Sequence, residues 1–458
     1  MNNKLKVREI YCPAHFGNTY EVALKNEMRE ILREAKFWGF NRYSDWFDTI
    51  DLYDLYSRKG RFYNMPEAVW ERKFSHYEIA AELGFELGLA ITPNHVFSDQ
   101  VSKGVPAKTG DRVFGQLICP SDSKSRKIIL NNCEHLFNDF KKKGLKLKSL
   151  EAGAYDYGGC LCEKCKPWIL TFARLCKEIK DMAKSYFDSI EMNLIGWWWS
   201  EEEHQIFTEW AEKEAKDYFH SMAFHLPYGE YSYDIGKRPI PSSCKERAFV
   251  HISYGEESEP RDAYGHFGPT IAPERIEKTV NFLAQRKAEG FIAYCEGAHE
   301  DINKALLGGI SSGKFKNAKE VLETYSERYF GANKSEWAEW IRQWGRPFTV
   351  NVKTARKEFE HLAKKAKKGW RFEQLKSKLK MFEAHHDVIL EKKWNKARKA
   401  AAQRFWDEKE YLWRKIWGLG LTRHAFKFDA SPPTWYDEYL KMLNKERTKI
   451  SSELIKEA

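Results

Sequence analysis

RAFVHISYGEE (247–257) opens the stretch that decides the fold, because PERIEKTVNFLAQRKAEG (273–290) and GFIAYCEG (290–297) follow it. The first and last segments are short, mostly apolar runs, which is typical of strands buried on both faces. The middle segment has apolar residues at helical spacing. A strand, a helix and a second strand in this order predict two parallel strands joined by a helix.

The same alternation runs through the first two thirds of the chain. Strands are predicted at 7–16, 41–48, 89–97, 147–156, 191–199, 222–229, 247–257 and 290–297. The helices predicted between them include 20–40, which ends at Gly39, and 74–88, 124–144, 167–187, 204–219 and 273–290. A further strand-like run, VFGQLICPS, occupies 113–121. Such units over about three hundred residues predict an α/β fold, a (β/α)8 TIM barrel. A doubly wound open sheet is the competing prediction, but no G-x-G-x-x-G sequence opens the first helix.

The pattern changes near residue 315, where helical sequence continues with no strand between the helices. A chain of 458 residues also exceeds the usual size of one domain. We therefore predict a catalytic barrel over 1–314 and a C-terminal α-helical domain over 315–458.

The basic charge is concentrated in the predicted helical domain. Residues 351–420 hold 20 Lys and Arg against 9 Asp and Glu, a net charge of +11 in a chain whose total is +10. Because these lysines alternate with Glu and apolar residues, the pattern is typical of a solvated helical face and does not favour nucleic acid. The excess could instead attract an acidic polysaccharide.

The sequence does not favour a membrane or secreted protein. No apolar run approaches the ~18–20 residues of a membrane span, and the start, MNNKLKVREIYC, lacks the apolar core of a signal peptide. Nine cysteines, an odd number, fit reduced thiols better than a disulfide framework. We expect a cytoplasmic protein, and a homo-oligomer is left open.

Polar and aromatic residues recur where the predicted strands end. In a closed barrel these ends meet on one face, where active sites lie. The residues predicted to contact a substrate there are His15, Asp45, Trp46, Asn94, Tyr155, Trp197, Trp199, His225, Tyr254 and Tyr294. Trp197 and Trp199 are expected to share one face of a strand, whose alternation places Trp198 opposite. With apolar strand interiors beneath, the pattern predicts a polar, ring-shaped substrate.

Two carboxyl groups are needed to hydrolyse a glycosidic bond, one to protonate the leaving oxygen and one to attack or to stabilise the oxocarbenium ion. Asp156 follows a nearly apolar strand and lies between two tyrosines, surroundings that raise the pKa of a carboxyl group as a general acid requires. Glu296 precedes Gly297, which leaves room for a ligand. Glu256 is the alternative second carboxylate.

The loop after Asp156 contains C-L-C-E-K-C, which supplies three thiols, Cys160, Cys162 and Cys165. Structural zinc takes four ligands, and the best remote candidates for the fourth are Cys133 and His135. A structural zinc ion would brace the loop; otherwise the thiols are reduced and pack beside a compact Gly-Gly turn. No other cofactor is expected.

The segments YDYGGCLCEKCKPW, LICPS and AYCEGAHEDINKAL resemble those of a broad, largely uncharacterised group of bacterial glycoside-hydrolase-like barrels. That group is similar to glycoside hydrolase families 20, 67 and 84. The resemblance covers about residues 7–330 and implies a catalytic acid at Asp156 and a substrate or catalytic carboxylate at Glu296. The chain has Cys295 where the group often has Ser. Tyr157 replaces the second acid of the family 20 pair, which argues against acetamido-assisted cleavage.

The leading prediction is a glycoside hydrolase that uses Asp156 with Glu296 or Glu256 on a glycoside or oligosaccharide. One alternative is a carbohydrate-binding barrel without productive carboxylate geometry. The other is a lyase or hydrolase that depends on a metal held by the thiols.

Overall fold

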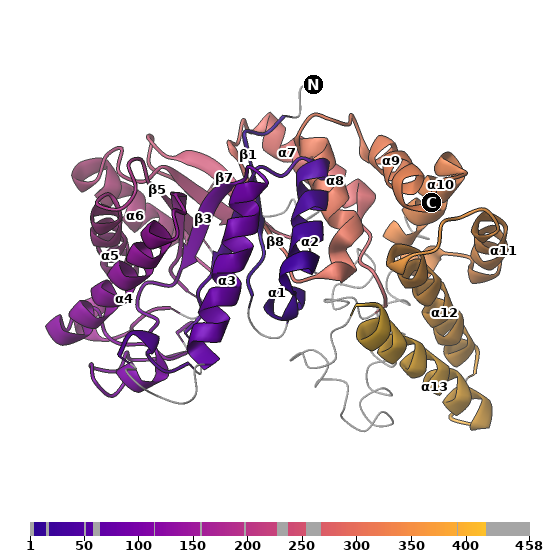
Figure 1. Cartoon of the computed structure of the whole chain (residues 1–458), viewed down its shortest axis with the longest axis horizontal. Coiled ribbons are helices and arrows are strands. Elements are labelled where there is room, and N and C mark those ends of the chain that lie inside the picture. The colour runs from indigo at the N-terminus through magenta and orange to yellow at the C-terminus, as the bar shows by residue number, and fades with distance from the viewer. Residues whose placement is uncertain are drawn as a thin grey trace.

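The structure is a computed structural model in which a barrel is followed by a group of helices (Figure 1). It describes residues 4–14, 18–49, 52–57, 65–113, 115–155, 158–196, 198–226, 237–252, 267–391 and 393–417. Within them, no helix is both long and apolar enough to cross a membrane.

Eight parallel strands form a closed barrel in chain order, as the sequence predicts. The strands are β1 (Val7–Tyr11), β2 (Arg42–Trp46), β3 (Glu86–Ile91), β4 (Leu147–Gly153), β5 (Glu191–Gly196), β6 (Ser221–His225), β7 (Lys245–His251) and β8 (Gly290–Tyr294). The ring closes where β1 pairs with β8, from Val7 opposite Gly290 to Tyr11 opposite Tyr294. A Cβ at position 290 would lie 1.8 Å from the Val7 carbonyl oxygen, so only glycine fits this junction.

Helices surround the barrel and bury its outer face. They are α1 (Thr19–Val22), α2 (Lys25–Trp38), α3 (Met65–Glu82), α4 (Ser123–Lys142), α5 (Trp168–Ala183), α6 (Glu201–Glu214), α7 (Pro273–Gln285) and α8 (Asp301–Ser311). α2 ends at Gly39, where the backbone takes φ +106°, as the sequence predicts.

Two predicted segments differ from the structure. The third strand is predicted at 89–97 but β3 covers Glu86–Ile91, because α3 ends at Glu82 and Gly84 turns the chain with φ +72°. The strand-like run 113–121 is outside the barrel and forms only isolated bridges, such as Leu117 with His95. This run nevertheless brings Cys119 close to the loop after β4.

The barrel interior is polar near the N-terminal ends of the strands, contrary to the expectation of apolar interiors. Ser44 donates a hydrogen bond to Glu9, and Ser149 donates to Glu151 at 2.6 Å. Arg42 lies 3.9 Å from Glu151. Burial, together with the charge of Glu151, raises the pKa of Glu9 to about 8.

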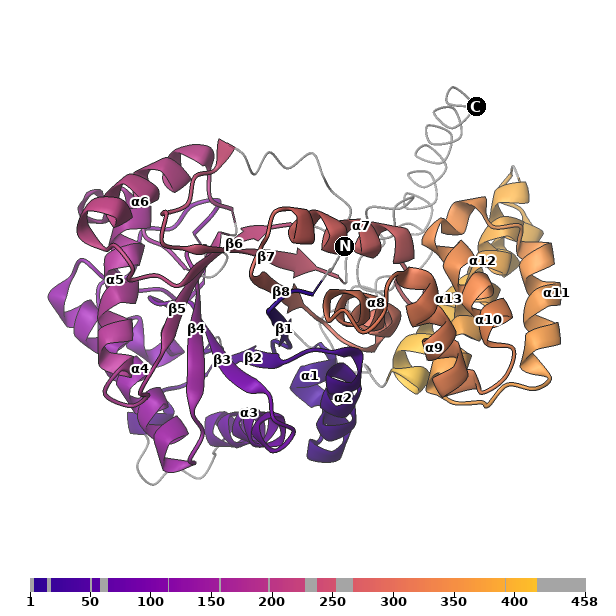
Figure 2. The ribbon, with the colours of Figure 1, turned by 90° about the horizontal axis from the view of Figure 1, so that it is seen from above.

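The chain continues as a group of helices beside α7 and α8 (Figure 2). They are α9 (Ala318–Phe330), α10 (Lys334–Arg342), α11 (Val352–Ala363), α12 (Trp370–Leu390) and α13 (Lys396–Tyr411), ending in a π-helical turn, Leu412–Ile416. The predicted domain boundary at 314/315 falls between α8 and α9.

These helices hold the loops that follow β7 and β8. Arg371 forms a two-point ion pair with Asp301 at 2.7 and 2.9 Å. The Lys378 ammonium, buried in the interface, donates to the carbonyl oxygens of Phe267 and Pro269 at 3.2 and 3.0 Å. The imidazole of His299 stacks on Trp413 at 6.4 Å.

Candidate active site

The barrel mouth, where the strands have their C-terminal ends, brings together part of the predicted site. Trp46, His225 and Tyr294 are the last residues of strands that converge there, and Glu296 follows β8 by two residues. Five other predicted residues lie outside the described part of the chain: His15, Asp156, Trp197, Tyr254 and Glu256.

Aromatic rings form a layer inside the barrel just below the mouth. Tyr11, Phe249 and Tyr294 contact one another with ring centroids 5.7 to 6.2 Å apart. Trp46 belongs to the same buried cluster, which is separate from the core between strands and helices. The rings are tilted or edge-on to one another, so the layer fills the barrel below the mouth with aromatic, apolar side chains.

Two histidines lie level with this layer, His251 opposite Tyr294 and His225 opposite Phe249 in the strand register. The ring of His251 stacks on Tyr294 with centroids 4.5 Å apart, and His225 meets His251 edge-on at 5.0 Å. Burial lowers the pKa of His225 to about 4, with the nearby Arg238 adding to the effect. It lowers the pKa of His251 well below its usual value. Both imidazoles are therefore neutral near pH 7 and suited to hydrogen-bonding hydroxyl groups.

His251 is not among the residues predicted to contact a substrate, although its place in β7 gives a signal. Arg247, Phe249 and His251 alternate along β7, and strand periodicity turns all three toward the barrel interior. His95, beside Trp46 at 5.7 Å, is a further buried imidazole of this face; burial lowers its pKa to about 3.

The backbone around Glu296 is fixed on both sides. The amide groups of Glu296 and Gly297 donate to one carboxylate oxygen of the buried Glu300, at 2.6 and 3.1 Å. The carbonyl oxygen of Glu296 accepts from the Thr19 amide at 3.1 Å. Lys304 donates to the Gly297 carbonyl oxygen at 2.7 Å. β8 ends at Tyr294, so strand alternation does not reach Glu296, which is buried two residues further along the chain.

Asp45 faces away from the mouth, contrary to its predicted role. Strand alternation turns Trp46 inward and Asp45 outward, toward α3. There its Oδ1 atom accepts from the Ala14 amide at 2.9 Å and lies 3.5 Å from the Lys73 ammonium. Asp45 therefore anchors the loop after β1.

Asn94 also supports loops instead of facing a ligand. Its side chain is buried and donates to the carbonyl oxygens of Ile118 and Gly159 at 3.1 and 2.7 Å. Its Oδ1 atom accepts from the Gly159 amide at 3.0 Å. Asn94 thus ties the loop after β3 to the loop after β4.

Trp199 lies in the core between α5 and α6, because β5 ends at Gly196 and strand alternation does not reach it. It is 1% exposed and contacts Phe172 and Phe207. Trp198 takes φ +60° and is the exposed residue of the pair.

Tyr155 connects the loop after β4 to the loop after β3 and to the start of α6. Its hydroxyl group donates to Glu203, and the guanidinium of Arg112 lies 3.8 Å from its ring centroid. Arg112 in turn pairs with Glu203 at 3.0 Å. The loop that leads into residues 156 and 157 is therefore fixed at Tyr155.

Four cysteine thiols converge beside this loop. The sulfur atoms of Cys119, Cys160, Cys162 and Cys165 all lie within 4.8 Å of one another, an arrangement that could bind a metal ion such as zinc. The predicted fourth ligands, Cys133 and His135, are not in this group. Hydrogen bonding with Cys165 lowers the pKa of the Cys160 thiol to about 5.

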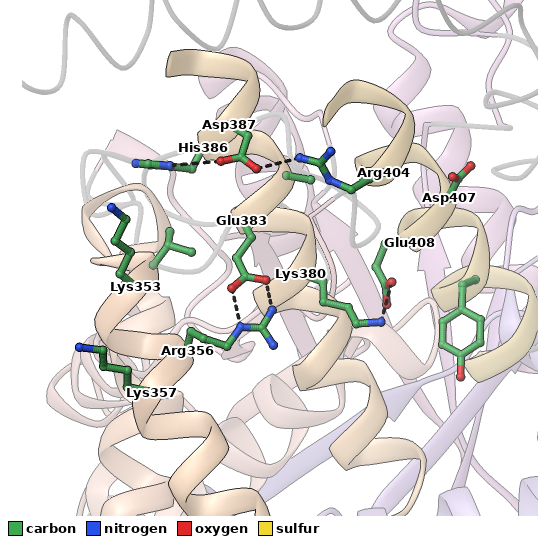
Figure 3. A pocket seen from close by; sticks show the side chains of 13 residues that line it. Lys353, Arg356, Lys357, Lys380, Glu383, His386, Asp387, Arg404, Asp407 and Glu408 are labelled. Atoms are coloured by element: carbon green, nitrogen blue, oxygen red, sulfur yellow. Dashed lines mark hydrogen bonds and ion pairs between the residues drawn. The ribbon is translucent and has the colours of Figure 1, made fainter. Parts of the chain in front are cut away.

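A separate cleft of about 910 Å³ lies between α11, α12 and α13 (Figure 3). Its walls carry both signs of charge, and ion pairs link neighbouring helices across it. These pairs are Arg356 with Glu383, Lys380 with Glu408, and Arg404 with Asp387. These pairs lie within 351–420 and leave its net charge of +11 unchanged, but they place acidic groups beside the basic ones, so the cleft does not present a purely basic surface.

No protein-family model matches the sequence, and neither does any curated protein. Among solved structures, the chain is distantly similar to an endo-1,4-β-mannanase from Rhizomucor miehei, with 11% identity, a TM-score of 0.45, and coverage of 68% of this chain and 95% of that one. The chain is also similar to a GH20 module of the pneumococcal exo-β-D-N-acetylglucosaminidase StrH. The identity is 12% and the TM-score 0.42, and the match covers 79% of this chain and 98% of that one. A β-amylase catalytic domain from Paenibacillus polymyxa has 10% identity and a TM-score of 0.41, with coverage of 67% and 97%. Similarity at this level says nothing of what the chain binds or cleaves.

Proposed function

We propose that the protein is a glycoside hydrolase that cleaves a glycoside or oligosaccharide at the barrel mouth by a two-carboxyl mechanism. Asp156 acts as the general acid and protonates the leaving oxygen. Glu296 is the second carboxylate, and attacks the anomeric carbon, activates water or stabilises the oxocarbenium ion. Glu256 is the alternative for this role.

The observation that carries the proposal is the fixed position of Glu296. Three neighbouring backbone groups, including its own amide and carbonyl, are held by Glu300 and Thr19, so the backbone that carries its carboxylate is positioned before a ligand binds. Glu296 comes two residues after Tyr294, which belongs to the aromatic layer. Neutral imidazoles at His225 and His251 would bind hydroxyl groups without adding charge.

Trp46 and Tyr294 provide ring contacts in this proposal, which also keeps Trp197 and Tyr254 as ring contacts and His15 as a hydroxyl-binding residue. The hydrolysis needs no cofactor. A metal held by four thiols has no open coordination position, so zinc at the cysteines would be structural and not a catalyst. Reduced thiols also support a cytoplasmic location.

The test is a panel of aryl glycosides assayed with the wild type, Asp156→Asn and Glu296→Gln. We expect at least one glycoside to be cleaved, and each variant to lose about 100-fold or more of kcat. Glu163→Gln is the matched control, since Glu163 is an exposed acid on the loop that follows Asp156. Equal turnover by Asp156→Asn would remove Asp156 from the mechanism. Sugar binding without any turnover would indicate a binding barrel.

A further inference from the structure

We propose that Cys119, Cys160, Cys162 and Cys165 bind one zinc ion as four thiolates and so join the loop after β3 to the loop after β4. This site goes beyond the proposed hydrolysis, because it takes no part in the reaction and stands whether or not the chain cleaves glycosides.

The spacing of the sulfur atoms fits a single tetrahedral ion. With zinc–sulfur bonds of about 2.3 Å, tetrahedral geometry separates the sulfurs by about 3.8 Å. The Cys119 sulfur lies 3.5 Å from that of Cys165 and 3.6 Å from that of Cys162. All four sulfurs fall within 4.8 Å of one another. Changes of up to about 1 Å in the distances between sulfurs would complete the coordination.

Backbone hydrogen bonds hold the two loops that supply the thiols, and one of these bonds joins the loops to each other. The Cys119 amide donates to the Val105 carbonyl oxygen at 2.8 Å, and the Leu161 amide donates to that of Lys108 at 2.9 Å. Asn94 joins the same loops through Gly159. Cys119 is 41 to 46 residues before the other three cysteines, so the fold itself brings the thiols together.

The surroundings favour negatively charged ligands. Cys119 precedes α4, which begins at Ser123, and Cys165 precedes α5, which begins at Trp168. The N-termini of helices stabilise nearby anions. The Ser121 hydroxyl group lies 3.0 Å from the Cys165 sulfur and can donate a hydrogen bond to a thiolate.

Other uses of four thiols explain the arrangement less well. A disulfide joins only two sulfurs and gives no reason for the other two to converge on them. A four-iron cluster attaches each cysteine to a different iron, which requires a wider spacing than that of sulfurs within 4.8 Å. A single ion accounts for all four.

The experiment is metal analysis of the full chain purified without chelator. We expect about one zinc ion per chain, as in structural four-cysteine sites. Cys119→Ser should lower zinc affinity about tenfold or more. Cys133→Ser is the matched control, because Cys133 lies in α4 but outside the thiol group, and it should retain the metal.

A spectrum of the wild type with cobalt(II) in place of zinc keeps the test decisive if Cys119→Ser fails to fold. We expect the intense visible bands of tetrahedral cobalt and sulfur-to-metal charge transfer. A chain without zinc whose cobalt spectrum lacks these bands would overturn the proposal. So would iron in place of zinc, or a folded Cys119→Ser variant with the zinc affinity of the wild type.

Discussion

Glu9 places an acid inside the barrel, where the fold offers it little water. Its carboxylate is fully buried, accepts from Ser44 and shares the interior with Glu151. Burial raises the pKa of Glu9 to about 8, so the folded chain keeps a proton there at neutral pH that the unfolded chain releases.

Stability should therefore fall as the pH rises from about 5 to 8, because over this range the folded state binds the additional proton. Each pH unit should lower the free energy of unfolding by up to about 1 kcal/mol through this group. Glu9→Gln removes the titration and mimics the protonated acid. Urea denaturation at several pH values should show a shallower decline for Glu9→Gln than for the wild type. Parallel curves would contradict the raised pKa of Glu9.

A second prediction concerns Glu300 and can be tested separately from the prediction for Glu9. Its carboxylate accepts from the amides of Glu296 and Gly297 in a fully buried site. Glu300→Ala would leave both donors without this partner, at a cost of about 1–3 kcal/mol each in the free energy of unfolding. Glu300→Gln keeps an accepting oxygen and should recover much of the loss. Thermal unfolding measures both variants, and equal stability of the alanine and glutamine variants would contradict this role.

Strand alternation explains which site residues the sequence could predict. Trp46, His225 and Tyr294 were assigned to the mouth because they end strands, and they lie there. Asp45 ends the same strand as Trp46 but takes the opposite side, where Lys73 binds it. Trp199 does not lie at the mouth for another reason. β5 ends at Gly196, and the residues that follow no longer have strand geometry.

Substitution of Gly290 tests the close approach of β8 to β1, where the barrel closes. A methyl group at this position would overlap the Val7 carbonyl oxygen at 1.8 Å. Gly290→Ala should lower the free energy of unfolding by about 3 kcal/mol or more, since backbone must move. Gly369→Ala is the control, because no atom lies within 4 Å of the added Cβ and the cost should stay below about 1 kcal/mol. Equal urea midpoints for the two variants would contradict this closure.

The alternation of short strand-like runs with helical sequence was sufficient to predict all eight strands and their order, although β2, RYSDW, is not an apolar run. It could not locate β3 correctly, since the apolar residues 89–97 continue past the strand into a loop. Nor could hydrophobic periodicity show which loops, distant in the sequence, lie side by side. Cys119 appeared as part of an unassigned strand-like run, and only the three-dimensional arrangement places it beside Cys162 and Cys165.

The barrel and the C-terminal helices together shape the mouth. Arg371 and Lys378 of α12 bind the segments after β8 and β7, and Trp413 stacks on His299, three residues after Glu296. The helical part thus supports the loop that carries the proposed second carboxylate. The barrel interior contains buried charged residues, so apolar packing holds the barrel together less than the sequence predicts. The contacts with the C-terminal helices therefore add support that the barrel interior lacks.

The proposed mechanism requires the closed barrel to bring Asp156 and Glu296 to a common rim. A crystal structure with the sugar identified by the glycoside panel would measure the distance between their carboxyl groups across the bound ring. We predict a separation of about 5 Å for a retaining enzyme or ~6.5–9.5 Å for an inverting one. A separation well beyond about 10 Å for both Glu296 and Glu256 from Asp156 would contradict the two-carboxyl mechanism.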